Sequence, residues 1–276
     1  MCDNCGCANV EPFDIIPMHS GTAVAEHHHG HSHGDGHHHH HHDDEPHHEH
    51  VHAHEHHTHT LPVHLSLLQK NDRLAERNRG YLKARRIFAI NIVSSPGAGK
   101  TALIANTLER LAPTLPAAVI VGDLETANDA ARLRDKGAPV VQVTTGTVCH
   151  LDADMVAHAL EHLPLEGRQL LIIENVGNLV CPASYDLGEA LRVVLISVTE
   201  GEDKPLKYPP IFHGAGVVII SKPDMLAASG LDIEKLHRNI RAVAPDAEIL
   251  ELCARTGEGM DQWIALLHSL AAEHGL

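Results

Sequence analysis

From about residue 87 onward, short apolar runs alternate with longer stretches of mixed polarity. The runs are rich in β-branched residues and apolar at successive positions, which is typical of strands covered on both faces of a parallel sheet. Apolar residues at helical spacing mark stretches between them, such as residues 99–111 and 128–137. This alternation predicts an α/β domain with a mostly parallel, doubly wound sheet. The expected strands are residues 87–93, 117–121, 139–145, 169–175, 191–198, 216–221 and 247–252.

The first 65 or so residues lack this alternation and are not expected to join a packed core. They hold 21 of the 28 histidines between His19 and His64, and residues 1–69 contain ten carboxylates but no Lys or Arg. Most of the formal charge of −15 therefore lies in this tail. We expect a metal-binding cysteine segment at residues 1–18, a disordered His-rich tract at 19–65 and a folded domain at 66–276. That domain is predicted to open with a charged helix over 66–86, whose apolar stripe is Leu67, Leu68, Leu74 and Leu82.

Charge, length and cysteine usage exclude several classes of protein. The body of the chain is only mildly acidic and has no broad basic face, so nucleic acid is not an expected partner. No apolar run approaches the roughly 18 residues of a membrane helix. The N-terminus also lacks the basic start and apolar core of a signal peptide. We expect a cytoplasmic protein whose six cysteines are ligands or packing residues rather than disulfides.

A phosphate-binding loop follows the first expected strand. SSPGAGKT, residues 94–101, matches the P-loop pattern G-x-x-x-x-G-K-[ST], although Ser94 stands in place of the first glycine. Glycine lets backbone N–H groups surround phosphate oxygens, the lysine meets the β- and γ-phosphates, and the hydroxyl binds Mg²⁺. A plain Gly/Ser/Pro turn is the alternative, but Lys-Thr opening a helix after a buried strand favours a nucleoside-triphosphate site. The expected nucleotide-binding residues are Gly97, Ala98, Gly99, Lys100 and Thr101.

The segment SKPD, residues 221–224, ends the sixth expected strand and favours GTP over ATP. Guanine-specific P-loop proteins carry N-K-x-D there, with the carboxylate accepting guanine N–H groups and the lysine packing on the base. Lys222 and Asp224 fit these positions, but Ser221 replaces the asparagine. After the last strand, CARTGEGM resembles the S-A-K loop of the base pocket, with Cys253 in the serine position. Lys-Pro-Asp is also an ordinary turn, and its place two strands after the acidic strand end favours the base-binding interpretation.

Carboxylates end two further strands. Asp123 and Glu125 follow the second strand, where they could hold Mg²⁺ waters or orient the attacking water. Alternatively, Glu125 and Asp129 only interact favourably with the positive N-terminus of the following helix. Glu174 and Gly177, in E-N-V-G, occupy the place of the D-x-x-G segment that senses the γ-phosphate in most GTPases. We therefore expect Lys100, Thr101, Asp123 and Glu174 to serve hydrolysis.

Cysteine and histidine mark a second kind of chemistry. Cys149 and His150 close the third strand and Cys181 follows the fourth, so the three could converge at one rim of the sheet. Two thiolates and an imidazole suit Zn²⁺ or Ni²⁺, with a fourth position for water or another subunit. Taken singly, each residue would more often be a packing cysteine or a surface histidine. Their shared location favours a metal site.

The N-terminal tail carries two further sets of metal ligands. C-x-x-C-x-C places Cys2, Cys5 and Cys7 where one loop can bring three thiolates onto one ion, with the terminal amine as a candidate fourth ligand. The six histidines at 37–42 resemble a purification tag, but fifteen other histidines surround them, which argues against that interpretation. Neutral imidazoles coordinate divalent ions, so we expect the tract to buffer or store metal.

Six segments in this order resemble the HypB family, the nickel-insertion GTPases of hydrogenase maturation. They are MCDNCGC, the His-rich tract, KNDRLAERNRGYLKARRIFAINIVSSPGAGKT, GDLET, CHLDA and IENVGNLVCP, which span essentially the whole chain. The resemblance implies a GTP-dependent, metal-regulated homodimer that passes Ni²⁺ toward the hydrogenase large-subunit precursor. It also implies an accessory metallochaperone as partner and, in some members, nickel storage by the tract. Cys2, Cys5 and Cys7 would then form a high-affinity nickel site, and Cys149, His150 and Cys181 a metal site shared across the dimer.

Two rival functions stay open at this point. A urease-type nickel GTPase is similar in fold, but it typically carries C-P-H and lacks C-x-x-C-G-C. A metal-storage protein with a vestigial nucleotide site is the other rival, and Lys100, Thr101 and Asp123 argue against it. Cys181 follows the γ-phosphate-sensing segment, and our hypothesis is that this loop couples nucleotide state to metal binding. The choice between Ni²⁺ and Zn²⁺ at this site also stays open.

Overall fold

The structure, a computed structural model, describes residues 13–18, 60–112, 114–124 and 128–275. Within these residues, eight strands form one sheet in the order β1-β4-β3-β5-β2-β6-β7-β8. Strands β2 to β8 pair in parallel, so the predicted doubly wound α/β domain is confirmed, each expected strand lying within two residues of its predicted ends. The strands are β1 (Asp14–Met18), β2 (Phe88–Ser94), β3 (Ala117–Asp123), β4 (Val140–Thr144), β5 (Leu170–Glu174), β6 (Leu191–Ser197), β7 (Val217–Ser221) and β8 (Glu248–Leu252).

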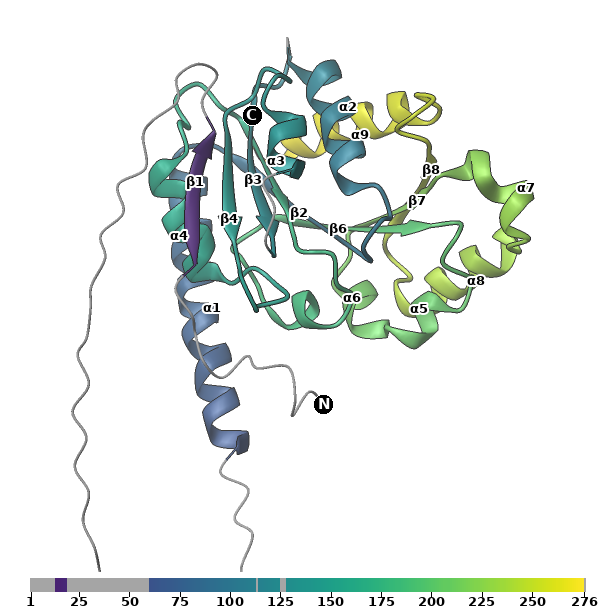
Figure 1. Cartoon of the computed structure of the whole chain (residues 1–276), viewed down its shortest axis with the longest axis horizontal. Coiled ribbons are helices and arrows are strands. Elements are labelled where there is room, and N and C mark those ends of the chain that lie inside the picture. Colours follow the sequence, from purple (N-terminus) through teal and green to yellow (C-terminus); the bar gives the residue numbers. More distant parts are fainter. Residues whose placement is uncertain (1–12, 19–59, 113, 125–127, 276) are drawn as a thin grey trace, which may run out of the picture.

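Helices cover both faces of the sheet (Figure 1). One face packs on α2 (Lys100–Leu111), α3 (Asn128–Leu133) and α9 (Met260–Glu273), around the buried Trp263. The other face packs on α1 (Thr60–Ala84) and α4 (Ala153–His162) over β3, β4 and β5, and on α6 (Pro209–His213) and α8 (Ile233–Val243) over β6 and β7. The described part of the chain also holds four short elements: α5 (Lys204–Lys207), α7 (Leu226–Ser229) and the 3₁₀ helices η1 (Cys181–Ser184) and η2 (Pro223–Met225). Among the described residues, no helix is long and apolar enough to cross a membrane.

Strand β1 corrects the expectation that the first 65 or so residues stay outside the packed domain. It pairs antiparallel with β4 at the edge of the sheet, from Asp14 opposite Thr144 to Met18 opposite Val140. Phe13 and Ile15 pack against the core on the α1 and α4 side. The strand is five residues long and contains Pro17, which lacks an N–H group and is tolerated on an edge strand. These properties hide it from a search for apolar runs.

Helix α1 begins at Thr60, six residues before the predicted start, and buries a different stripe from the one expected. Its buried positions are Asn71, Ala75, Asn78 and Leu82, which share one helix face because they are three or four residues apart. Of the predicted leucines only Leu82 is buried, and Leu67 is 43% exposed. The face of α1 that packs against the domain therefore includes two asparagine side chains.

Candidate nucleotide and metal site

The carboxyl ends of β2 to β5 carry the loops in which the predicted site residues lie. Residues 95–99 follow β2, Leu124 follows β3, residues 145–152 follow β4 and residues 175–180 follow β5. Because these strands are parallel and adjacent, their loops gather at one edge of the sheet, where ligands of doubly wound folds bind.

The P-loop places Lys100 at the start of α2 with its side chain buried. Gly97 and Gly99 have φ angles of 74° and 106°, a left-handed conformation that glycine adopts without strain. Lys100 Nζ donates to Ser94 Oγ at 2.9 Å, so the serine in place of the first glycine contacts the lysine. Burial lowers the pKa of Lys100, and the nearby carboxylates, Glu174 foremost, oppose that shift.

Thr101 and Glu174 meet beneath the P-loop. Thr101 Oγ1 donates to Glu174 Oε1 at 2.7 Å, and both side chains are buried. Within the described part of the chain, Glu174 Oε2 has no hydrogen-bond partner. Burial raises the pKa of Glu174 to about 7 against the attraction of Lys100. A buried hydroxyl beside a carboxylate with one oxygen lacking a hydrogen-bond partner is a donor set that suits Mg²⁺.

Asp123 is half-buried at the end of β3, which pairs in parallel with β5, so it lies at the same end of the strands as Glu174. Its Oδ1 accepts from the Leu124 N–H at 2.8 Å. Glu125, the second predicted carboxylate, lies outside the described residues.

A cavity of about 240 Å³ lies beside the P-loop, between the ends of β7 and β8. It is lined by Gly99, Lys222, Asp224, Cys253 and Arg255 among others. Asp224 Oδ1 accepts from the Cys253 thiol at 3.0 Å, and its Oδ2 pairs with the Arg255 guanidinium. These hydrogen bonds, that from Cys253 foremost, lower the pKa of Asp224, which favours its ionised form.

Ser221 and Lys222 tie this cavity to the P-loop. Ser221 Oγ donates to the Ala98 carbonyl at 2.8 Å, and Lys222 Nζ donates to the Gly97 carbonyl at 2.6 Å. The serine that departs from the N-K-x-D pattern thus bonds to the loop. Ser221 replaces the asparagine of that pattern, and the Asp224 carboxylate still lines the cavity.

The structure brings Cys149, His150 and Cys181 together into one cluster, which we call the metal cluster. The Sγ atoms of the two cysteines are 2.9 Å apart, and the candidate ligand atoms of all three residues lie within 4.8 Å of one another. Donor atoms bound at about 2.0–2.3 Å to a tetrahedral ion lie roughly 3.3–3.8 Å apart. Small side-chain shifts would therefore place all three on one ion.

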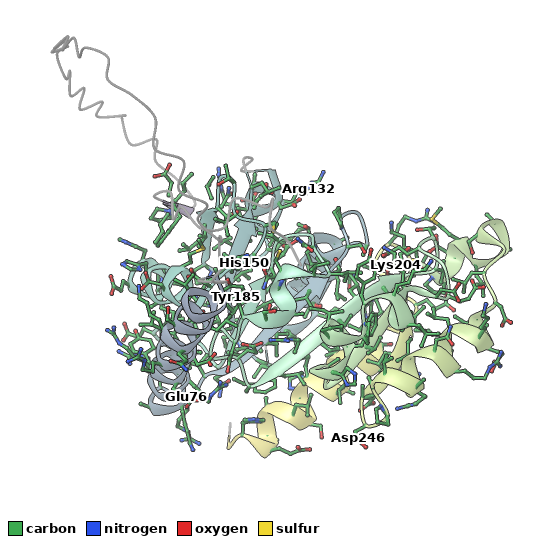
Figure 2. All side chains as sticks on the ribbon, turned by 90° about the horizontal axis from the view of Figure 1, so that it is seen from below. Glu76, Arg132, His150, Tyr185, Lys204 and Asp246 are labelled. Atoms are coloured by element: carbon green, nitrogen blue, oxygen red, sulfur yellow. The ribbon has the colours of Figure 1, made fainter. Side chains whose placement is uncertain are left out.

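His150 is held in a form that can coordinate metal. It is 4% exposed and stacks on Tyr185, with the ring centroids 3.9 Å apart, as their neighbouring positions in Figure 2 show. Burial lowers the pKa of His150 to about 4, so the ring is neutral near pH 7. Its Nδ1 has no hydrogen-bond partner among the described residues. A neutral imidazole with a free ring nitrogen is the form that binds metal.

Residues 174–181 run from the P-loop to the metal cluster, and we call them the linking segment. Glu174 bonds to Thr101 at its start, and a Cβ on Gly177 would lie 3.0 Å from Pro96 Cα, so the segment lies directly on the P-loop. Asn175 Oδ1 accepts from the Leu151 N–H at 3.1 Å, next to His150. Cys181 ends the segment in the metal cluster.

Three residues of this region were missed by sequence reasoning. Asn175 and Arg255 lie within the E-N-V-G and CARTGEGM motifs, but at positions to which the motifs gave no role, and Tyr185 lies in neither motif. Their contacts join residues 24 to 35 positions apart. Other predicted ligands lie outside the described residues: Cys2, Cys5, Cys7 and the histidines of the tract up to His59.

Comparison with known proteins identifies the family. The nucleotide-binding domain of the CobW/HypB/UreG family matches residues 88–251. Hydrogenase maturation factor HypB of Escherichia coli strain K12 is 53% identical over 209 residues, which are 76% of this chain and 72% of the relative. The probable hydrogenase maturation factor HypB of Methanocaldococcus jannaschii is 41% identical over 213 residues, covering 77% and 96% of the two chains.

Solved structures agree with this assignment. HypB from Helicobacter pylori in complex with nickel is 39% identical with a TM-score of 0.70, over 74% of this chain and 96% of that one. Hydrogenase maturation factor HypB from Archaeoglobus fulgidus is 40% identical with a TM-score of 0.69, over 74% and 99%. The P-loop, the linking segment and the metal cluster all lie within residues 88–251, which match the family's nucleotide-binding domain. The chain therefore belongs to the HypB family of hydrogenase maturation factors.

Proposed function

We propose that this chain is a cytoplasmic GTPase that binds Ni²⁺ as its cargo and delivers it during maturation of [NiFe]-hydrogenase. The observation that carries the proposal is the linking segment, which contacts the P-loop through Glu174 and Gly177 and ends at the metal cluster. Nickel in the crystallised relative supports the choice of cargo. Membership in the HypB family favours hydrogenase over urease as the target.

In this proposal, the P-loop binds and orients the triphosphate for in-line attack by water. Lys100 compensates the charge that develops on the phosphate oxygens, and Asp123 orients the water. Thr101 and Glu174 would hold Mg²⁺, and their buried hydroxyl and under-compensated carboxylate fit that role. When bound, the ion neutralises charge on the β- and γ-phosphates. Burial of the Lys100 side chain lowers the local dielectric and strengthens its electrostatic interactions.

Asp224→Asn is expected to convert the preference of the nucleotide site from guanine to xanthine. The Asp224 carboxylate would accept both guanine N–H donors, and losing one such bond costs roughly 10- to 100-fold in affinity. Xanthine keeps the N1–H but carries a C2 carbonyl, which matches the one acceptor and one donor of an asparagine amide. Hydrolysis of GTP and XTP by parent and variant measures the switch.

Gain of XTP turnover in Asp224→Asn also serves as the folding control, because a misfolded variant would hydrolyse neither nucleotide. Unchanged GTP affinity in this variant would place the base away from the cavity between β7 and β8.

Replacing residues 19–59 with a Gly/Ser linker of equal length is expected to remove most bound nickel equivalents and to leave GTP turnover near the parent value. The replaced stretch lies between the end of β1 at Met18 and the start of α1 at Thr60, so the described elements are kept. Nickel stoichiometry after dialysis and steady-state phosphate release are the two measurements. Collapse of turnover would instead make the tract structural or regulatory. Absence of turnover in the parent chain would favour a metal-storage protein.

The metal cluster supplies three ligands from one chain, which supports a fourth ligand from water or from a second copy. Val180, next to Cys181, is 50% exposed, so the cluster lies near the surface. We propose a homodimer that forms with GTP and metal. Its partners would be an accessory metallochaperone and the hydrogenase large-subunit precursor. Cys2, Cys5 and Cys7 would be the high-affinity nickel site, and Zn²⁺ is the competing ion at the cluster.

A further inference from the structure

We propose that Asn71 and Asn78 of helix α1 are positioning residues of the metal cluster, which hold its two ligand-bearing segments in register. The inference rests on the proposed function, because it concerns the same cluster. The first segment is residues 149–153, which carries Cys149 and His150 and which we call the Cys149 segment. The second is residues 181–189, the Cys181 segment.

Asn71 bridges the two segments with one side chain. Its Oδ1 accepts from the Ala153 N–H at 2.9 Å, and its Nδ2 donates to the Asp186 carbonyl at 2.9 Å. Ala153 is the first residue of α4, and the N–H groups of a first helical turn have no partner within their own helix. The amide of Asn71 therefore completes the start of α4 and joins it to the Cys181 segment.

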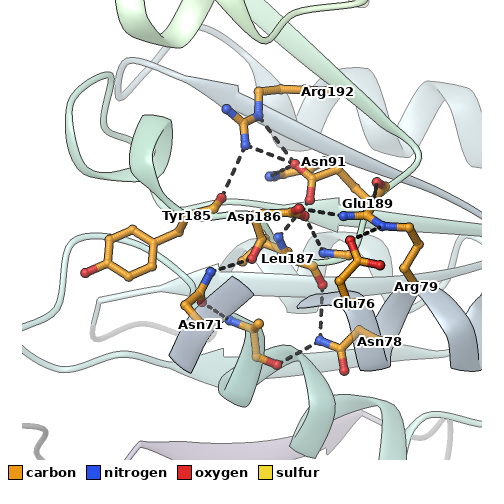
Figure 3. A network of polar contacts seen from close by, with 12 residues as sticks. Asn71, Glu76, Asn78, Arg79, Asn91, Tyr185, Asp186, Leu187, Glu189 and Arg192 are labelled. Atoms are coloured by element: carbon orange, nitrogen blue, oxygen red, sulfur yellow. Dashed lines mark hydrogen bonds and ion pairs between the residues drawn. The ribbon is translucent and has the colours of Figure 1, made fainter. Parts of the chain in front are cut away.

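Asn78 repeats this bridge two helical turns later (Figure 3). Its Nδ2 donates to the Ala153 carbonyl at 2.8 Å and to the Leu187 carbonyl at 3.1 Å. Asn71 and Asn78 are 5% and 3% exposed, so water cannot replace these bonds easily. Ala153 is thus bonded through both its N–H and its carbonyl to one face of α1.

The Cys181 segment also fits closely against α1. A Cβ on Gly188 would lie 2.6 Å from the Ala75 carbonyl oxygen and 2.7 Å from Asn78 Cβ, so only glycine allows this approach. Arg79 on the same helix donates to the Glu189 carbonyl and forms an ion pair with Asp186. Close packing as well as hydrogen bonds therefore holds the Cys181 segment against α1.

The hydrogen bonds of Asn71 and Asn78 fix the distance between the Cys149 segment and the Cys181 segment, and metal binding depends on that distance. Two ligands, Cys149 and His150, lie three or four residues before Ala153, and the third, Cys181, lies five or six residues before Asp186 and Leu187. Stacking of His150 on Tyr185 adds a contact between the same two segments. Loss of the bridges would let the segments separate and would cost affinity without removing a ligand. Groups that orient metal ligands typically contribute about 10- to 100-fold in affinity.

The test uses the full chain with Cys2, Cys5 and Cys7 replaced by serine. Co²⁺ and Ni²⁺ are titrated while the thiolate-to-metal charge-transfer band is followed. Histidines of the tract give no such band, and they compete equally in every variant. Asn71→Ala and Asn78→Ala are compared with Asn239→Ala. Asn239 also donates one amide hydrogen bond, to the Glu202 carbonyl at 2.8 Å, but it lies on α8.

We expect each α1 variant to bind about 10-fold more weakly, with a shifted charge-transfer band, and the Asn239 variant to match its parent. Circular dichroism and thermal unfolding establish that each variant is folded at the titration temperature. Equal affinity and an unchanged band in folded α1 variants would overturn the proposal. If Asn71→Ala does not fold, Asn71→Asp keeps the acceptor for the Ala153 N–H and replaces the donor to the Asp186 carbonyl with an oxygen, which cannot donate there when ionised. This variant must also shift the band.

If the parent chain gives no thiolate-to-metal band at all, the metal cluster does not bind metal. That result would contradict the proposed function, and this inference would fall with it. A band in the parent that the asparagine variants leave unchanged contradicts the inference alone.

Discussion

Replacing Lys100 by alanine is expected to lower the rate of GTP hydrolysis by at least roughly 10²–10³-fold. Lys100 Nζ lies buried in the P-loop beside Ser94, where the phosphates would bind. Its loss removes the cation that would compensate charge on the phosphate oxygens and leaves Glu174 without its nearby positive charge. Single-turnover phosphate release measures the effect. The metal capacity of the N-terminal tail is expected to stay intact.

Lys235→Ala is the matched control, because Lys235 forms an exposed ion pair with Glu202 on a different part of the domain. It should retain parental turnover. Substantial hydrolysis by the Lys100 variant would contradict the assignment of this loop to catalysis. Parallel loss of metal capacity would show that tail and domain do not act separately.

Cys181→Ala is expected to weaken metal binding at the metal cluster and to abolish its response to nucleotide. Removing one of three protein ligands should cost at least about 10- to 100-fold in affinity. In the parent, the linking segment should make metal affinity differ between the GDP state and a non-hydrolysable GTP analogue. Such couplings are typically about 1–3 kcal/mol, or roughly 5- to 150-fold. Charge-transfer titration of the full chain, with Cys2, Cys5 and Cys7 replaced by serine, resolves effects of this size.

Reciprocity gives a second measurement of the same coupling. If nucleotide changes metal affinity by some factor, metal must change nucleotide affinity by that factor. Ser184→Ala, a change at an exposed residue of the same 3₁₀ helix, should leave both affinities as in the parent. Identical metal affinities in the two nucleotide states of the parent would exclude coupling, and Cys181 would then be an ordinary ligand or a packing residue.

The sheet could be predicted because its parallel strands are buried on both faces and read as continuous apolar runs. The P-loop was recognisable for a related reason: its chemistry depends on residues adjacent in sequence. Strand β1 has neither property, since it is short, contains Pro17 and pairs with a strand more than a hundred residues away. Its pairing depends on the unpaired edge that β4 offers rather than on a pattern of apolar residues in β1 itself.

Helix α1 shows why part of the site escaped prediction. A search for an apolar stripe selects leucines, whereas the face that α1 buries includes Asn71 and Asn78, whose amides bond to backbone groups of distant loops. The sequence does not reveal whether an asparagine is buried or exposed, because this depends on hydrogen-bond partners that lie far away in the chain. The contact of Asn175 with Leu151 was hidden in the same way.

Strand β1 has a consequence for the cysteines that precede it. Because β1 runs antiparallel to β4, its first residue, Asp14, lies opposite Thr144 at the edge where the metal cluster is found. Cys7 is seven residues before Asp14, and a seven-residue chain reaches at most about 25 Å. The edge strand is thus a short tether, and if Cys2, Cys5 and Cys7 bind nickel as proposed, it would hold the ion at an effective concentration of about millimolar order near the cluster. Transfer between the two sites would then be intramolecular, and its rate would not fall as the protein is diluted.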